Sequence, residues 1–165
     1  QAAATILSAN ITKMKSRLAP RSWRNAVWFI NQDVEPQLYT LHVAVKNVAG
    51  SENVGGFASP PVTYVPPGTQ GNEYGLLMGR PVIPVEYCAT LGTAGDIVLA
   101  DLSQYLGIDK DSVDAQVSIH VRFLYDEQTF RFILRFNGQP LWSSAVTPYK
   151  GSNTVSPFVA LATRA

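Results

Sequence analysis

Cys88 is the only cysteine of the chain, and a cysteine paired with a histidine base is a common nucleophile in hydrolases. Asp96 or Asp101 could orient such a base. Neither His42 nor His120, however, lies in a catalytic motif such as Gly-x-Ser-x-Gly or His-Glu-x-x-His. Cys88 also follows an apolar run, and free cysteine is among the residue types most often buried. We interpret it as a packed or surface thiol and keep a small cysteine-dependent hydrolase only as an alternative.

Two other kinds of site fail on spacing. The two histidines lie 78 positions apart without a paired ligand beside either, so the sequence indicates no metal site. The segment GSENVGG at residues 50–56 lacks the Gly-Lys-Ser/Thr ending of a phosphate loop, and no strand leads into it. A flexible turn is the better interpretation. We expect no catalytic residue, no metal and no cofactor.

Four basic side chains are the candidates for contact with another molecule: His120, Arg122, Arg131 and Arg135. They could share one face of a two-stranded hairpin. One hypothesis is that this face pairs with an acidic patch of another subunit, or with DNA. The other is that it is a solvated face that discourages edge-to-edge aggregation. Both remain open.

Three tryptophans are expected in the core or at an interface: Trp23, Trp28 and Trp142. Sites that stack nucleic-acid bases need basic residues beside the aromatic ring, and only Trp23 has them.

The composition favours a protein that contacts other chains. Charged residues make up 15% of the 165 residues, against about 25% in an ordinary domain. A neutral surface of this kind is typical of interfaces, although the 12 Gly and 11 Pro are also compatible with a loop-rich monomer. The net charge of +1 is not that of a protein that grips phosphates. No apolar run reaches the roughly 18 residues of a membrane helix, and no leader points to export.

Hydrophobic spacing predicts two helices in the first half of the chain. The first spans residues 2–18, with Ser8 or Asn10 as its cap and Pro20 beyond its end. A buried strand is expected at 26–30. A second helix begins near Asp33, with Pro36 in its first turn and apolar positions continuing to Val45.

Residues 47–79 are rich in Gly, Pro, Ser and Asn, which predicts an extended excursion with a short hairpin or strand near the apolar residues 62–65. Strands are expected at 81–87 and 96–100, joined by a turn at 90–95. Asp101 could cap a short helix at 101–106. A last short strand is expected at 158–161.

The clearest pattern is a pair of alternating runs. Apolar residues recur at every second position in 117–125 and again in 130–136, on either side of the polar residues 126–128. This pattern predicts a long antiparallel hairpin. Because strands and helices alternate without a βαβ rhythm, the fold class is α+β.

Several blocks resemble the major capsid proteins of tailed phages, the Hong Kong 97-like family. They are RSWRNAVWFIN at 21–31, YGLLMGRPVIPVEYCATLGTAGDIVLADLSQYLG at 74–107, SIHVRFLYDEQTFRFILRFNGQP at 118–140, TPYK at 147–150 and SPFVALATRA at 156–165. The blocks stand in the family's order and together cover most of the chain.

The resemblance implies a truncated Hong Kong 97-like fold: a mixed sheet with flanking helices and a long antiparallel hairpin. Residues 1–112 and 144–165 would form an axial-type domain, and residues 113–143 a hairpin of the peripheral domain. Family subunits are longer, so an N-terminal arm, an extended loop and a spine helix would precede Gln1.

The function implied is that of a structural subunit of an icosahedral phage or prophage capsid, which assembles in the bacterial cytoplasm and resides in the virion. Its partners would be copies of itself in pentamers and hexamers, scaffold and portal proteins, and packaged double-stranded DNA without sequence specificity, with no membrane. His120, Arg122, Arg131 and Arg135 would then be candidate intersubunit contacts. A shell protein of an encapsulin-like nanocompartment is the nearest alternative.

Overall fold

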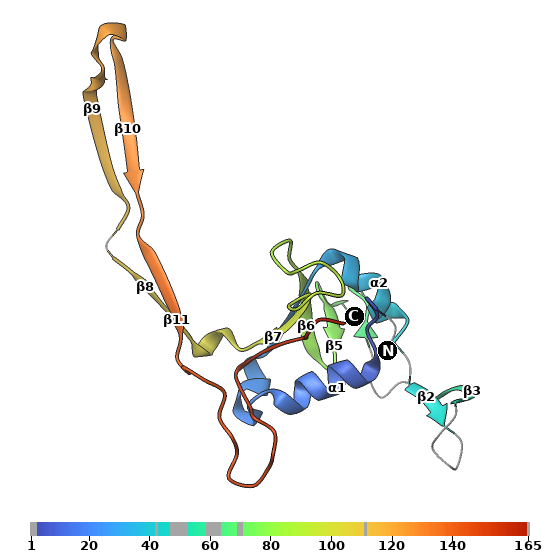
Figure 1. Ribbon diagram of the computed structural model, residues 1–165. Coiled ribbons are helices and arrows are strands. Elements are labelled where there is room, and N and C mark those ends of the chain that lie inside the picture. Colours follow the sequence, from blue (N-terminus) through green and yellow to red (C-terminus); the bar gives the residue numbers. More distant parts are fainter. Residues whose placement is uncertain are drawn as a thin grey trace. The chain divides into compact units, whose positions relative to one another are not determined.

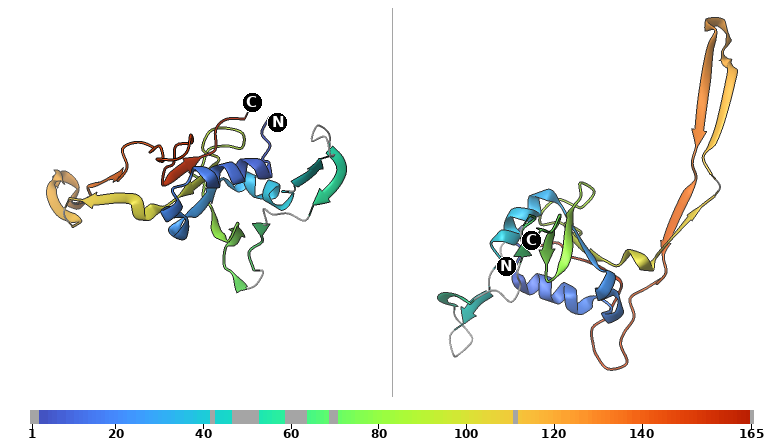
Figure 2. Two further views of the ribbon diagram at one scale, coloured as in Figure 1. Left: turned by 90° about the horizontal axis from the view of Figure 1, so that it is seen from below. Right: turned by 180° about the vertical axis from the view of Figure 1, so that it is seen from behind.

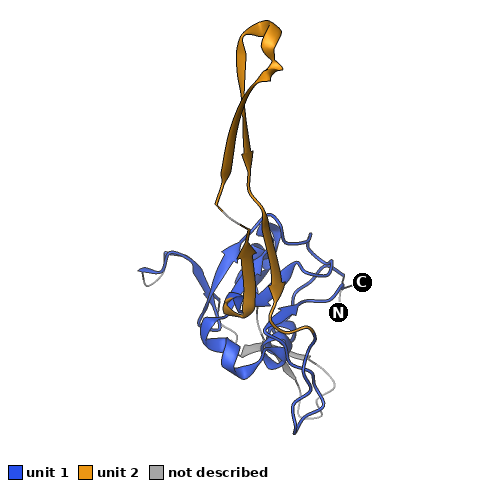
Figure 3. Ribbon diagram, turned by 90° about the vertical axis from the view of Figure 1, so that its left-hand side faces the viewer, with its two compact units in different colours: residues 1–102, 144–165 blue, residues 103–143 orange. Residues whose placement is uncertain are grey.

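The computed structural model describes residues 3–41, 43–46, 53–58, 64–68, 71–110 and 112–164. The chain forms two compact units, coloured separately in Figure 3. Unit 1 comprises residues 1–102 and 144–165, and unit 2 comprises residues 103–143.

Unit 1 is built on a mixed six-stranded sheet (Figure 1). Its strands, in spatial order, are β12 (Phe158–Ala160), β7 (Ile97–Ala100), β1 (Val27–Ile30), β6 (Arg80–Pro84), β5 (Gly75–Leu77) and β4 (Tyr64–Val65). β1 and β6 are parallel, and every other neighbouring pair is antiparallel. The strands expected at 26–30, 81–87, 96–100 and 158–161 are therefore confirmed.

The core of unit 1 follows from the alternation of the central strands. Trp28 pairs with Val82 on one side and with Leu99 on the other, so these three side chains share a face. All three are buried, and the Nε1 of Trp28 donates a hydrogen bond to the carbonyl of Leu77 (3.1 Å). Helix α1 (Ser8–Arg17) adds its buried side chains Ile11 and Met14 to the same cluster. Figure 2 shows α1 lying across the sheet.

The first helix is confirmed but is shorter than expected. Its N-cap residue is Leu7, which makes no side-chain capping hydrogen bond, so the prediction of Ser8 or Asn10 as the cap is wrong. After α1 the chain forms the 3₁₀ helix η1 (Pro20–Asn25), which leads directly into β1.

The second helix is also confirmed at its start and wrong at its end. A 3₁₀ turn, η2 (Gln32–Val34), continues into α2 (Glu35–Tyr39), with Pro36 in the first turn. The helix stops there, and Val45 lies in strand β2 (Val43–Lys46), which pairs with β3 (Asn53–Ala58). Local apolar spacing cannot report this, because the pairing of two strands overrides helix propensity.

The Gly- and Pro-rich excursion contains strands β3, β4 and β5 within its described parts, and its remainder lies outside the described residues. The ring of Tyr64 in β4 crosses the backbone of Gly75 in β5. A Cβ added at Gly75 would lie 2.5 Å from the Tyr64 hydroxyl, so this position requires glycine.

Unit 2 is a long antiparallel hairpin made of two ladders. β9 (Asp114–Arg122) pairs with β10 (Glu127–Ile133), and β8 (Tyr105–Asp109) pairs with β11 (Phe136–Pro140). The 3₁₀ turn η5 (Phe123–Tyr125) and Asp126, which has a left-handed φ of 53°, close the hairpin.

The hairpin is thus confirmed and its details are corrected. The turn lies at 123–126 and not at 126–128. The helix expected at 101–106 is the single 3₁₀ turn η4 (Leu102–Gln104), because residues from Tyr105 onward pair with β11. β8 therefore belongs to the same compact unit as the hairpin, and the unit boundary lies at 102/103. The α+β class is confirmed, with a mixed sheet and few helices.

Candidate intersubunit surface

The hairpin of unit 2 has one polar and one apolar face between Asp114 and Ile133. Residues that are directly opposite in an antiparallel ladder point to the same face. Phe130 pairs with Val117 and Phe132 with Ala115, which makes the apolar face. The polar face carries the pairs that alternate with these: Thr129 with Ser118, Arg131 with Gln116, and Glu127 with Arg122.

The apolar face is open to solvent. Phe132 is 70% exposed, and the other large apolar side chains of the hairpin are also exposed. Among them are Val117, Ile119, Val121, Phe130, Leu134 and Phe136. At the closed end, Phe123, Leu124 and Tyr125 project from the turn, with Leu124 92% exposed. An apolar surface of this extent is typical of contact with another polypeptide.

Two glycines in the β8–β11 ladder let aromatic rings of the opposite strand pack against the backbone. A Cβ at Gly138 would lie 2.4 Å from the ring of Tyr105, and one at Gly107 would lie 3.1 Å from the ring of Phe136. Such rings packed across strand glycines stabilise a ribbon that has no core beneath it.

The four predicted contact residues occupy different places on the hairpin. Arg122 forms an exposed ion pair with Glu127 (3.0 Å). Glu127 is also its partner in the ladder, and Glu127 and Arg131 are four positions apart on β10, so Arg122 and Arg131 lie on the same face. His120 lies where the register shifts, and its backbone N–H donates to the Ser118 hydroxyl (3.3 Å). Arg135 follows β10, and its carbonyl accepts a hydrogen bond from the Lys110 N–H (3.0 Å). Their role as intersubunit contacts stays a prediction.

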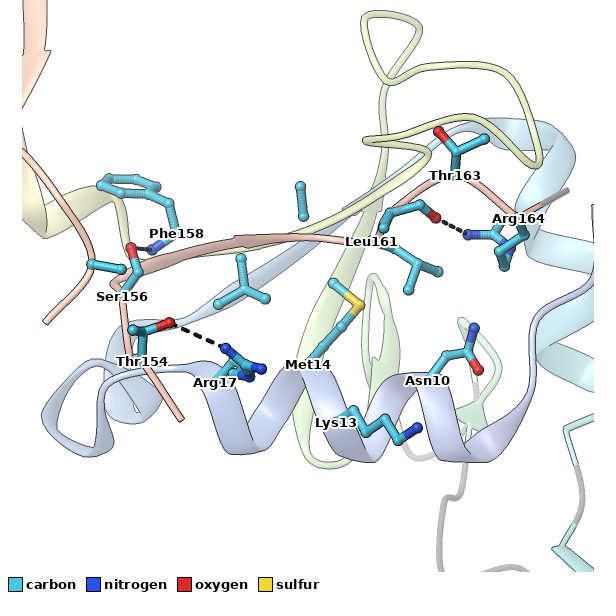
Figure 4. Close-up of a pocket in the computed structure, with 14 residues that line it drawn as sticks. Asn10, Lys13, Met14, Arg17, Thr154, Ser156, Phe158, Leu161, Thr163 and Arg164 are labelled. Carbon is cyan, nitrogen blue, oxygen red and sulfur yellow. Dashed lines mark hydrogen bonds between the residues drawn. The ribbon is translucent and has the colours of Figure 1, made fainter. Parts of the chain in front are cut away.

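A second surface feature is a groove in unit 1 between α1 and the C-terminal segment, with a volume of about 570 Å³ (Figure 4). Arg17 Nη1 donates to Thr154 Oγ1 (3.1 Å) at one end of the groove, and Arg164 lies at the other. The lining contains no Asp, Glu, His or Cys. It therefore offers no carboxylate, imidazole or thiol for acid–base or nucleophilic chemistry.

Arg164 forms a buried ion pair with Asp96, whose side chain has no exposed surface. Asp96 also accepts a hydrogen bond from the Gly92 N–H (3.0 Å). The carboxylate thus fixes both the 90–95 turn and the C-terminal segment. Nothing local in the sequence predicts this pair, because its partners are 68 residues apart.

Cys88 is half-buried at the same end of the sheet. Burial raises the pKa of its thiol, and the negative charge of Asp96 raises it further. A nucleophilic cysteine needs the opposite, a lowered pKa that yields thiolate at neutral pH. Asp96 is engaged with Arg164, and His42 lies outside the described residues. The geometry of Cys88 is that of a packing residue.

The described part of the chain meets the requirements of neither a metal site nor a membrane-spanning helix. No three His, Cys, Asp or Glu side chains gather there in a way that could hold a metal ion. No described helix is both long and apolar enough to cross a membrane.

The sequence matches the family model of the phage capsid family over residues 1–151. This chain belongs to the phage capsid family. The match spans the four strands of the hairpin and five of the six strands of the sheet, all but β12, so family membership rests on most of both units.

A solved structure supports the capsid fold. The chain is similar to a subunit in the capsid of an empty GTA particle, which was computed with C5 symmetry, with a TM-score of 0.50 and 15% sequence identity. The similarity covers 79% of this chain and 40% of that subunit, so this chain spans less than half the length of its structural neighbour. No curated protein matches the sequence.

Proposed function

We propose that this chain is part of a self-assembling shell subunit of a phage or prophage capsid that encloses double-stranded DNA. Its partners would be other copies of the subunit in pentamers and hexamers, together with scaffold and portal proteins. The shell would assemble in the host cytoplasm, and DNA would be contacted without sequence specificity. Unit 1 would serve as the axial-type domain and the hairpin as an arm of the peripheral domain.

The exposed hairpin is the observation that carries this proposal beyond family membership. A two-stranded ribbon is marginally stable by itself in water. Burying one large apolar side chain stabilises a protein by about 1.5–3 kcal/mol, and unit 2 leaves at least ten such side chains exposed. A hairpin of this composition is suited to being covered by further polypeptide in a shell.

The charges of the hairpin favour protein over DNA as the covering partner. Between residues 103 and 143 the sequence has four basic and five acidic residues, so the hairpin carries no basic excess. Binding to phosphates needs such an excess. Arg122 is moreover already paired with Glu127.

The absence of catalysis is part of the proposal. The raised pKa of Cys88 and the commitment of Asp96 to Arg164 both oppose a hydrolase. No observation favours the nanocompartment shell over the virion.

Electron microscopy of the protein expressed alone from its complete gene tests the proposal. We expect closed shells or capsomer rings. A protein that stays monomeric at high concentration and shows turnover of an ester or peptide substrate, lost in Cys88→Ser, would contradict it.

A further inference from the structure

Exposed basic and exposed acidic residues of unit 1 gather at opposite ends of its sheet. β1 and β6 are parallel and in register from the pair Trp28–Val82 to the pair Ile30–Pro84. The segments that enter both strands therefore lie at one end of the sheet, and the segments that leave both strands lie at the other.

The end at which β1 and β6 begin is basic. We call it the basic end and define it by Lys15, Arg17, Arg21, Arg24 and Arg80. The ring of Trp23 joins three elements there: Lys15 Nζ of α1 lies 4.7 Å from the ring centroid, and Arg80 Cζ of β6 lies 5.7 Å from it. Arg80 also donates to the carbonyl of Arg24.

Asp101 is an acidic residue at the basic end, and it is buried. Asp101 follows Ala100, which pairs with Val27 at the start of β1. It is 2% exposed, so it does not contribute a carboxylate to the surface. Lys15 and Arg24, by contrast, are exposed. The surface presented at this end is cationic.

The end at which β1 and β6 finish is acidic. We call it the acidic end and define it by Asp33, Glu35, Glu73 and Glu86. Glu35 and Glu73 line one hollow together with Tyr64, whose hydroxyl donates to Glu35 Oε1 (3.0 Å). Arg164, a cation at this end, is neutralised by the buried Asp96.

Exposed tyrosines accompany these carboxylates. Tyr39 of α2 is 56% exposed and packs edge-on against Tyr64 (centroids 5.1 Å apart). Tyr87, which follows β6, is fully exposed. Tyrosine and arginine are enriched at protein interfaces, and a guanidinium or ammonium group binds the face of an aromatic ring.

We propose that the basic end of unit 1 in one copy binds the acidic end of unit 1 in the next copy, head to tail. This inference rests on the proposed function and names an interface within the shell. A two-fold contact of either end with itself would bring like charges together. A head-to-tail contact pairs opposite charges in every repeat and produces a ring when its rotation closes.

Nucleic acid is the competing partner for the basic end, and the acidic end speaks against it. Phosphates would account for the five cations of the basic end but not for four carboxylates and exposed tyrosines on the same unit. A second copy of this chain accounts for both.

Paired charge reversals in the protein expressed from its complete gene test the inference. The basic-end variant is Lys15→Glu with Arg24→Glu, and the acidic-end variant is Asp33→Lys with Glu86→Lys. All four residues are exposed. The matched control for a single reversal compares Lys15→Glu with Lys13→Glu, two exposed lysines of the same helix of which only Lys15 contacts Trp23. The readouts are the protein concentration needed for assembly, by sedimentation, and ring size, by electron microscopy.

Each double variant alone should need at least about a tenfold higher concentration to assemble, because two like-charged side chains are then introduced into every contact and most of its opposite charge is lost. The net charge falls from +5 to +1 at the reversed basic end and from −4 to 0 at the reversed acidic end. An equal mixture should assemble again, with the variants alternating around the ring. Alternation closes only with an even number of subunits, so the mixture should form hexamers in preference to pentamers. Lys13→Glu should assemble more readily than Lys15→Glu. If a reversal lowers the melting temperature, the neutral variant Lys15→Gln with Arg24→Gln is measured in its place. It should weaken assembly in the same direction as the reversal but by a smaller factor.

Unchanged assembly of both double variants would overturn the inference and leave the proposed function standing, whereas a wild-type protein that never assembles would overturn the function itself. Loss of assembly in both variants without rescue in the mixture would also overturn the head-to-tail contact. So would a basic-end variant that assembles normally but no longer binds a DNA fragment, because the basic end would then serve nucleic acid.

Discussion

Both units contain strands that carry apolar side chains at alternate positions, but these side chains are buried in unit 1 and exposed in unit 2. In unit 1 the alternate positions of β1 are buried, and Trp28 has no exposed surface. In unit 2 the alternate positions of β10 are equally apolar, yet Phe132 is 70% exposed. The difference is that α1 and the neighbouring strands supply buried side chains against β1, whereas the described hairpin has only its partner strand. Apolar alternation therefore indicates a face to be covered and does not say by which chain.

Truncation of one large aromatic side chain in each unit should give the largest contrast. Trp28→Ala removes a fully buried ring and the hydrogen bond to Leu77, and should lower the free energy of unfolding of unit 1 by about 3–5 kcal/mol. Phe132→Ala removes an exposed ring and should change it by less than about 0.5 kcal/mol. Urea denaturation followed by tryptophan fluorescence for the second variant, and by circular dichroism for both, measures this. Equal losses would contradict the comparison.

Two ion pairs, one in each unit, should differ in the same direction. Arg164→Ala leaves the Asp96 carboxylate buried without its partner, which should cost about 3 kcal/mol. Arg122→Ala removes an exposed pair with Glu127 on the hairpin and should cost about 0–1 kcal/mol. The melting temperatures of the two variants, at low and at high salt, provide the measurement. A hairpin variant that melts as low as Arg164→Ala would show that unit 2 has a stabilising contact that its exposure does not indicate.

The reactivity of a thiol should also differ between the two units, but this effect is smaller than the differences in stability. The pKa of Cys88 is raised by burial and by Asp96, so at pH 8 less thiolate forms than on an unfolded chain, and alkylation by iodoacetamide should be several-fold slower. The reference is Val121→Cys in a Cys88→Ser background, which places a thiol at an exposed hairpin position. The two rates should converge as the pH approaches and passes the raised pKa. Faster alkylation of Cys88 than of the hairpin thiol at pH 8 would reopen the hydrolase alternative.

Replacement of Cys88 should have the smallest effect. Cys88→Ser should leave solubility and self-association unchanged, because no partner group near the thiol depends on it for chemistry. Sedimentation velocity of the variant beside the wild type checks this.

The elements that the sequence predicts are those whose pattern is local. The sequence predicts the β9–β10 hairpin and strand β1, because the alternation or apolar content of each strand lies within ten residues. The sequence does not predict the strand that follows α2, because Val45 continues the helical spacing but lies in a strand paired with β3.

The pairing of β8 with β11 and the ion pair of Asp96 with Arg164 also escaped prediction. Both join residues far apart in the chain, and single-sequence patterns carry no information about such distances. The separation of charge between the ends of unit 1 became visible only once β1 and β6 were known to be parallel.

The central claim is that the hairpin is covered by polypeptide when the shell assembles, and hydrogen exchange tests it most directly. The amides of β9 and β10 should exchange rapidly in the isolated 165-residue chain and at least about a hundredfold more slowly in assembled particles, whereas the amides of β1 and β7 should be protected in both. Hairpin amides that exchange equally fast in the particle and in the free chain would contradict the account.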